Sequence, residues 1–204
     1  MKKYKPKTRE ELKSLVDDLS INLGDIDTSA ITDMSGMFYN SSRKDFSGIE
    51  SWDVSNVTNM SGMFEYCKKF NQPLNDWNVS SVTNMSYMFS NCKKFNQPLS
   101  GWDVSSVTDM SGIFINCFKF NQPLNDWNVS SVTNMGMMFY NCENFNQPLD
   151  NWDVSSVTFM NYMFYNCKKF NQPLSGWDVS SVTDMSYMFN GCFISQKLAG
   201  VIDE

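Results

Sequence analysis

Apolar residues recur along this chain with a fixed period of 25 residues. Within one period, residues 70–94, they form two groups with different spacing. Leu74, Trp77 and Val79 lie two and three residues apart, and Pro73 disfavours a helix immediately before them. The first group therefore predicts a short extended strand, which would form a parallel ladder with the same segment of the neighbouring periods.

The second group of apolar residues has a longer spacing. Val82, Met85, Phe89 and Cys92 follow one another at intervals of three to four residues, which is the spacing of one helix face. Ser81 precedes them and is a good N-cap residue. We expect a helix of one or two turns over residues 82–92, which is too short to be stable without packing.

A period of this length is typical of a solenoid, in which each repeat buries its apolar face against its neighbours. The predicted fold class is an α/β repeat solenoid, with a parallel strand ladder and one short helix in each 25-residue turn. An all-β solenoid is the alternative.

The two ends depart from the period. Residues 1–25 are expected to form a helical cap, because Thr8 and Glu11 make a capping box before an apolar stripe of Leu12, Leu15, Val16 and Leu19. Residues 26–192 form about seven repeats, of which the first is degenerate. Residues 193–204 are expected to close the other end.

Three columns of equivalent residues are interpreted as scaffold. They are the tryptophans, the cysteines and an asparagine column: Trp52, Trp77, Trp102, Trp127, Trp152 and Trp177; Cys67, Cys92, Cys117, Cys142, Cys167 and Cys192; Asn71, Asn96, Asn121, Asn146 and Asn171. Cysteines stacked about 5 Å apart with parallel side chains are poorly placed for disulfides, so we expect free thiols in the core. With no histidine and no Cys-x-x-Cys pair, we expect no metal and no cofactor.

Composition narrows the class of partner. The net charge is −6, which argues against a nucleic-acid partner. No segment approaches the roughly 20 apolar residues of a membrane span, so we expect no membrane insertion. The basic N-terminus is followed by no apolar stretch, which argues against a secretory signal. Free cysteines fit a cytoplasmic location.

The repeat itself resembles a known family. Residues 95–99, F-N-Q-P-L, and residues 102–110, W-D-V-S-S-V-T-D-M, resemble the repeats of BspA-like leucine-rich-repeat proteins of bacterial surfaces, over about residues 26–192. The resemblance implies a leucine-rich-repeat-like solenoid that serves adhesion or protein–protein interaction, at the cell surface or secreted. The family repeat carries no catalytic residues.

Two sets of solvent-facing positions are candidates for function. The first is an apolar patch where aromatic residues replace small or polar ones: Ile115, Tyr140, Phe159, Tyr162 and Tyr165. The second is an acidic strip beside the tryptophans: Asp53, Asp76, Asp103, Asp126, Asp153 and Asp178. The alternatives are that the aromatic rings complete the packing and that the carboxylates are ordinary solvated groups. Lysine pairs after the cysteines are interpreted as a solvated edge rather than a basic ridge for polyanions.

The predicted function is a non-enzymatic binding scaffold for a protein or glycan partner. Serine, threonine and aspartate occur in every repeat rather than at one special site, so no enzyme is expected. A glycan- or ion-binding solenoid and a structural array without a dedicated ligand are the alternatives. The exposed ends also allow homodimerisation.

Overall fold

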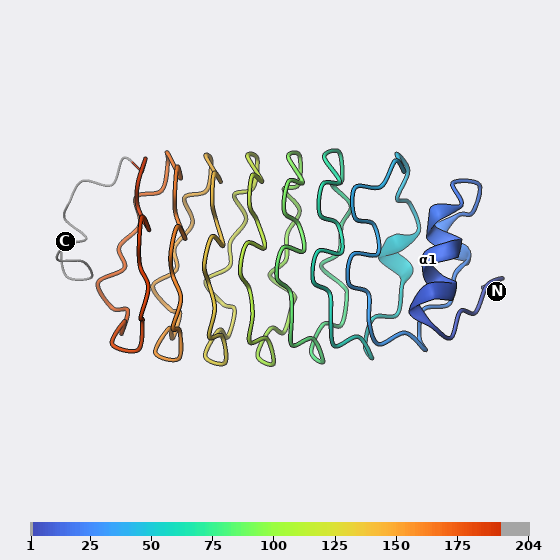
Figure 1. The fold of residues 1–204 in the computed structure, drawn as a ribbon, viewed down its shortest axis with the longest axis horizontal. Coiled ribbons are helices and arrows are strands. Elements are labelled where there is room, and N and C mark those ends of the chain that lie inside the picture. Colours follow the sequence, from blue (N-terminus) through green and yellow to red (C-terminus); the bar gives the residue numbers. More distant parts are fainter. Residues whose placement is uncertain (1, 193–204) are drawn as a thin grey trace.

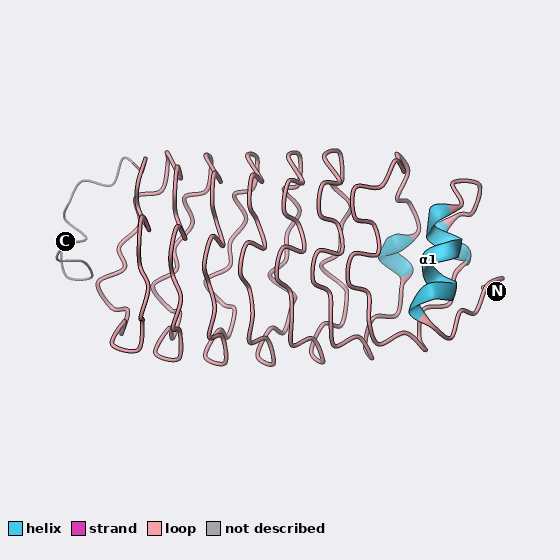
Figure 2. Ribbon diagram, in the orientation of Figure 1, coloured by secondary structure: helices cyan, strands magenta, loops and turns pink. Residues whose placement is uncertain are grey.

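The computed structural model describes residues 2–192, and the chain forms a row of stacked coils (Figure 1). Helix α1, Arg9–Asp17, lies across the N-terminal end of the row. Two 3-10 helices follow, η1 at Leu23–Asp25 and η2 at Ile49–Ser51. The coils after η2 contain neither a helix nor a named strand in the part of the chain that the structure describes (Figure 2).

Neighbouring coils are joined by parallel backbone bridges in one column. Each bridge joins equivalent residues, and the column consists of Asp33, Asn59, Asn84, Asp109, Asn134, Phe159 and Asp184. Every second amide after the bridge also reaches the next coil. The amide of Met60 donates to Asn84 O at 2.9 Å, and that of Phe64 donates to Met88 O at 2.9 Å.

The intervening amides close tight turns within their own coil. The amide of Met63 donates to Met60 O at 3.2 Å, and that of Cys67 donates to Phe64 O at 2.9 Å. The third residue of each of these turns has a positive φ, 58° at Gly62 and 63° at Tyr66, as a type II turn requires. Alternating bonds to the next coil and within the coil satisfy this backbone without helix or regular sheet.

The helix predicted over residues 82–92 is therefore wrong. Its spacing of three to four residues comes from consecutive turns with i to i+3 hydrogen bonds, which also place every third or fourth side chain inside. The predicted ladder over residues 74–79 is also displaced, because the amide of Trp77 bonds Leu74 O in its own coil at 3.1 Å. The bridges lie instead in the segment predicted to be helical. Assignment to the leucine-rich-repeat-like class stays a prediction.

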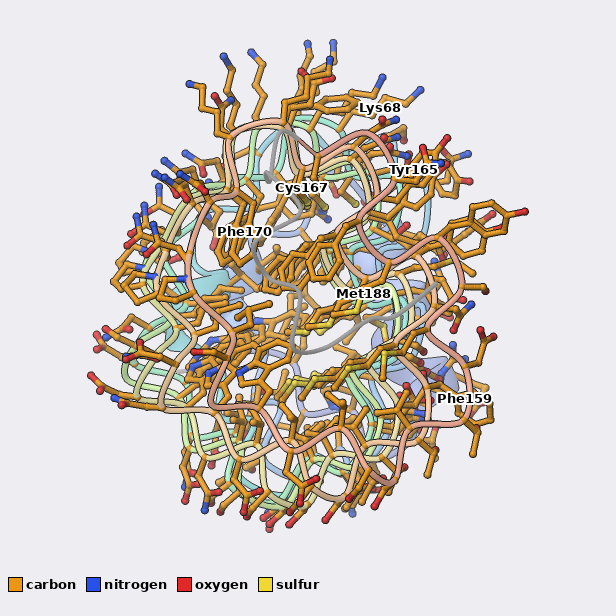
Figure 3. All side chains as sticks on the ribbon, turned by 90° about the vertical axis from the view of Figure 1, so that its left-hand side faces the viewer. Lys68, Phe159, Tyr165, Cys167, Phe170 and Met188 are labelled. Carbon is orange, nitrogen blue, oxygen red and sulfur yellow. The ribbon has the colours of Figure 1, made fainter. Side chains whose placement is uncertain are left out.

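Aromatic columns fill the interior. Phe64 and Phe89 stack with ring centroids 5.6 Å apart and an interplanar angle of 7°. Phe64 also stacks on Phe70 of its own coil at 4.0 Å. All three rings are fully buried. Figure 3 shows Phe170 and Met188 pointing into this interior. Each coil thus covers the open face of its neighbour, which gives the stack a continuous core.

The tryptophan column also links the coils through hydrogen bonds. Each indole N–H donates to a backbone carbonyl of the preceding coil, as Trp102 does to Leu74 O at 2.8 Å and Trp127 does to Leu99 O at 3.0 Å. The rings of Trp102 and Trp127 lie nearly parallel, with centroids 6.4 Å apart. A buried indole needs a partner for its N–H. The segment that has no backbone ladder is therefore held together by side chains.

The six cysteines are free, and all but Cys192 are buried. Their thiols donate to the carbonyl of a phenylalanine in the preceding coil, as Cys92 does to Phe64 O at 3.1 Å. Burial raises the pKa of Cys67 to about 11 and raises that of Cys117 further. A thiol kept neutral in this way is neither a nucleophile nor a metal ligand.

We expect the native protein to resist thiol reagents. At pH 8 a disulfide reagent such as 5,5′-dithiobis(2-nitrobenzoate) should label only Cys192 quickly, because the other five thiols are buried. Unfolding in guanidinium chloride without a reductant should release all six thiols. Fewer than six thiols after unfolding would show that disulfides form. Rapid labelling of the native protein beyond Cys192 would show that the column is accessible.

Candidate interaction surface

A cluster of four tyrosines lies near the C-terminal end of the described stack. Tyr140 and Tyr165 stack with centroids 4.7 Å apart and an interplanar angle of 5°. Tyr162 and Tyr187 stack at 5.0 Å and 17°. Tyr162 joins the two pairs, with its centroid 5.7 Å from that of Tyr165. We call Tyr140, Tyr162, Tyr165 and Tyr187 the tyrosine cluster.

The backbone turns direct part of this cluster outward. Tyr162 and Tyr187 occupy the third residue of a turn, with φ of 57° and 56°. For a residue with a Cβ atom this left-handed conformation costs roughly 1–2 kcal/mol. Glycine stands at the equivalent position in other coils, at Gly62 and Gly112. Bulky rings in a conformation that favours glycine are a local cost without a packing gain in the core.

The sequence-predicted patch is only partly brought together. Tyr140, Tyr162 and Tyr165 are joined by ring contacts. Ile115 lies beside another ring, because a Cβ built on Gly112 would meet both Tyr87 Cε1, at 2.6 Å, and Ile115 Cδ1, at 2.8 Å. Tyr187 was missed by the sequence analysis, although it stands 25 residues after Tyr162 in the same column.

Phe159 lies apart from the tyrosine cluster. It is 46% exposed and occupies the bridge column, and Figure 3 shows it on the same side of the coil as Tyr165 but at a different corner. The other bridge residues are Asn or Asp, whose side chains accept from the amide two residues on, as Asn84 does from Ser86 at 2.9 Å. Phenylalanine cannot accept this bond. The coil that contains Phe159 therefore lacks the side-chain contact to its turn and has an exposed ring at that position.

The predicted acidic strip separates into two columns. Asp53, Asp103, Asp153 and Asp178 follow a tryptophan, whereas Asp76 and Asp126 precede one. Each member of the first column accepts from the backbone amide of the serine two residues later, as Asp103 does from Ser105 at 3.1 Å. Hydrogen bonds from Ser105 lower the pKa of Asp103. These carboxylates therefore have a structural role in Asx turns.

The exchange of Asp for Asn in this column has the same explanation. Asn78 accepts from the amide of Ser80 at 3.2 Å, so either residue type can make the turn. Among residues 2–192, no group of three Asp, Glu, Cys or His side chains is arranged to hold a metal ion. The carboxylates are spread along the stack, whereas Ca²⁺ requires six to eight oxygens at one point.

One further feature was not predicted. It is a second amide ladder, in which Asn141 Nδ2 donates to Asn116 Oδ1 at 2.7 Å and Asn166 Nδ2 donates to Asn141 Oδ1 at 3.0 Å. The lysine pairs lie where the sequence places a solvated edge, with Lys68 and its equivalents exposed at one corner of the coils (Figure 3). Of the lysines that follow a cysteine, Lys168 pairs with a carboxylate, that of Glu143, at 2.9 Å.

The structure thus defines a repeat protein of stacked 25-residue coils with an aromatic surface cluster. The chain belongs to the family described as "Mycoplasma protein of unknown function, DUF285", whose model matches residues 10–117 and 98–200. The two matches overlap and together include helix α1, except for Arg9, and the coils that follow it. No curated protein and no solved structure matches the chain. None of the helices described in residues 2–192 has the length and apolar character to cross a membrane.

Proposed function

We propose that the chain is a non-enzymatic binding scaffold for protein–protein interaction or adhesion, similar to BspA-like surface proteins. The tyrosine cluster is the observation that carries the proposal. Tyrosine is enriched at the energetic centre of protein interfaces, where its ring buries area and its hydroxyl bonds the rim. Stacking holds these four rings in place before a partner binds, which reduces the entropy lost on association.

A non-enzymatic role is supported by the chemistry of the side chains. The sequence has no histidine. The thiols of Cys92, Cys117, Cys142 and Cys167 are held neutral, because burial raises their pKa well above the ordinary value. These four thiols are thus not activated as nucleophiles.

The test replaces cluster residues by those of other coils. Tyr162→Gly and Tyr165→Ser copy Gly112 and Ser90, which occupy the equivalent positions, so the fold should be kept. We expect the double variant to bind at least about 100-fold more weakly to partners identified on an array of purified proteins, since a hot-spot residue contributes about 2 kcal/mol or more. Biolayer interferometry measures the affinities.

Leu19→Ser is the matched control, because Leu19 is an exposed apolar residue, at 56%, on the N-terminal cap. It should leave every affinity unchanged. Equal binding by the parent chain and the double variant would contradict the proposed anchor. A parent chain that binds no protein would favour a structural array without a dedicated ligand. Sedimentation velocity on the same samples measures homodimerisation.

A further inference from the structure

A groove lies where the column of Tyr162 and Tyr187 begins. In the first two coils this column holds Gly36 and Gly62, which have no side chain. In some later coils the same position holds a tyrosine, as at Tyr87 and Tyr162. The space is an open groove of about 390 Å³, with Tyr39 and Tyr87 among its lining residues. This volume is within the range of small-molecule sites.

Both aromatic residues are braced by neighbours. A Cβ built on Gly112 would lie 2.6 Å from Tyr87 Cε1, so the Tyr87 ring rests directly over that glycine. The ring of Tyr39 is edge-on to Tyr66, with centroids 5.8 Å apart and an interplanar angle of 80°. Tyr39 is 55% exposed and Tyr87 is 37% exposed. The rings are therefore ordered yet accessible.

The rest of the lining is polar, and its two charges balance. Ser35, Ser61 and Ser86 line the groove together with Arg9 and Glu65. The Arg9 guanidinium extends from α1 and donates to Ser35 O, with Nε at 3.2 Å. The Glu65 carboxylate lies over the floor, since a Cβ built on Gly62 would be 3.3 Å from its Oε2.

We propose that this groove binds one pyranose unit of a neutral glycan. The C–H face of a pyranose ring packs on the negative face of an aromatic ring, and the groove is lined by two tyrosines, Tyr39 and Tyr87. Its hydroxyls both donate and accept, and the serines, Glu65 and Arg9 offer both functions. A polyanion or polycation would meet one like charge in the groove, and a lipid chain would leave these polar groups without partners. This site is separate from the tyrosine cluster, and its ligand is of a different class.

The test fills the groove with a side chain that the fold already accepts. Gly62→Tyr reproduces Tyr87 and Tyr162, whose φ of 57° equals that of Gly62 within one degree. The new Cβ would be in tight contact only with the flexible end of Glu65, 3.3 Å from its Oε2, and in ordinary contact with its Cβ at 3.9 Å. Gly176→Tyr is the matched control, because a Cβ built on Gly176 meets nothing within 4 Å and Gly176 lies outside the groove.

Saturation-transfer NMR with the methyl glycosides of glucose, galactose, mannose and N-acetylglucosamine serves as the probe. We expect at least one glycoside to bind the parent chain, with saturation strongest on its ring C–H protons. Gly62→Tyr should abolish the signal, Tyr87→Ala should weaken binding about tenfold, and Gly176→Tyr should change nothing. Circular dichroism checks that each variant is folded.

Three results would overturn the assignment. They are no binding of any glycoside by the parent chain, equal binding by the parent chain and Gly62→Tyr, and binding restricted to peptides on a parallel peptide array. If the peptide signal is lost in Gly62→Tyr, the groove is a peptide site and the glycan proposal is wrong. These outcomes do not depend on whether the tyrosine cluster binds a protein.

Discussion

Raising the pH from 8 to 11 is expected to unfold the stack cooperatively. Burial raises the pKa of five cysteines, to about 11 for Cys67 and higher for Cys117. In the unfolded chain the same thiols ionise near pH 8.5. Between these values the folded state binds more protons than the unfolded state, so the free energy of unfolding falls as the pH rises.

The expected size of this effect exceeds that of most single substitutions. Each thiol removes about 1.4 kcal/mol per pH unit once its unfolded form is ionised. Because the pKa of five buried thiols is raised in the same direction, the loss of stability per pH unit should be several times that of a single group. The stability conferred by the neutral thiols is fully present below about pH 8.

Urea denaturation followed by circular dichroism, at intervals from pH 7 to 10.5, measures this dependence. Cys117→Ala should reduce the number of protons released on unfolding by about one, because one buried thiol no longer titrates. The slope of the free energy of unfolding against pH should become shallower to match. A free energy of unfolding that stays constant to pH 10.5 would contradict the neutral-thiol column. A variant with the same steepness as the parent chain would assign the effect to other groups.

The sequence predicted which residues are buried better than it predicted the local backbone. Trp77, Phe89 and Cys92 are all in the core, as their 25-residue columns indicated. A column requires only that each coil repeats its neighbour, so the burial of an apolar column follows from its period and its residue type, without knowledge of the local backbone. The helix over residues 82–92 failed because consecutive i to i+3 turns give nearly the same apolar spacing as a helix. The choice between them depends on hydrogen bonds to the next coil, which a single repeat does not contain.

The same ambiguity between a helix and consecutive turns limited the prediction of the candidate surface. Phe159, Tyr162 and Tyr165 recur every three residues, which on a helix would place them on one face. On the observed turns Phe159 stands in the bridge column and belongs to another corner of the coil. Tyr187 joins Tyr162 across coils instead. Contacts between coils therefore define this surface better than spacing within one repeat.

Arg43→Met is expected to lower the free energy of unfolding by about 3–5 kcal/mol. Arg43 lies in the first coil, is only 8% exposed, and reaches the end of α1. Its Nη2 donates to Val16 O at 3.0 Å and to Asp18 O at 2.8 Å, and its Nη1 donates to Ile21 O at 3.1 Å. Helix α1 has no basic residue in its last turn, so this guanidinium supplies the donors that its carbonyl end lacks.

Methionine keeps the unbranched stem of the side chain as far as the position of Nε but removes the guanidinium and every donor. The carbonyls of Val16 and Ile21 would then lose this donor at the joint between α1 and the coils, at a cost of roughly 1–3 kcal/mol for each carbonyl left without a partner. The carbonyl of Asp18 would keep only the amide of Ile21, at 3.2 Å. Lysine keeps the charge but not the planar guanidinium. The free energy of unfolding of Arg43→Lys should therefore lie between those of the parent chain and Arg43→Met. Lys44→Met is the control, since Lys44 is the exposed neighbour and should change stability by less than about 0.5 kcal/mol.

Urea denaturation measures the loss of stability, and hydrogen exchange of the α1 amides shows where it occurs. The exchange should accelerate first in Arg9–Asp17, because the detached cap would expose the apolar face of the first coil. Equal stability of Arg43→Met and Lys44→Met would show that the guanidinium does not hold the cap. A loss of stability without faster exchange in α1 would place its effect elsewhere in the stack. Either result would leave the contacts of Leu12 and Val16 with the core as the main attachment of the helix.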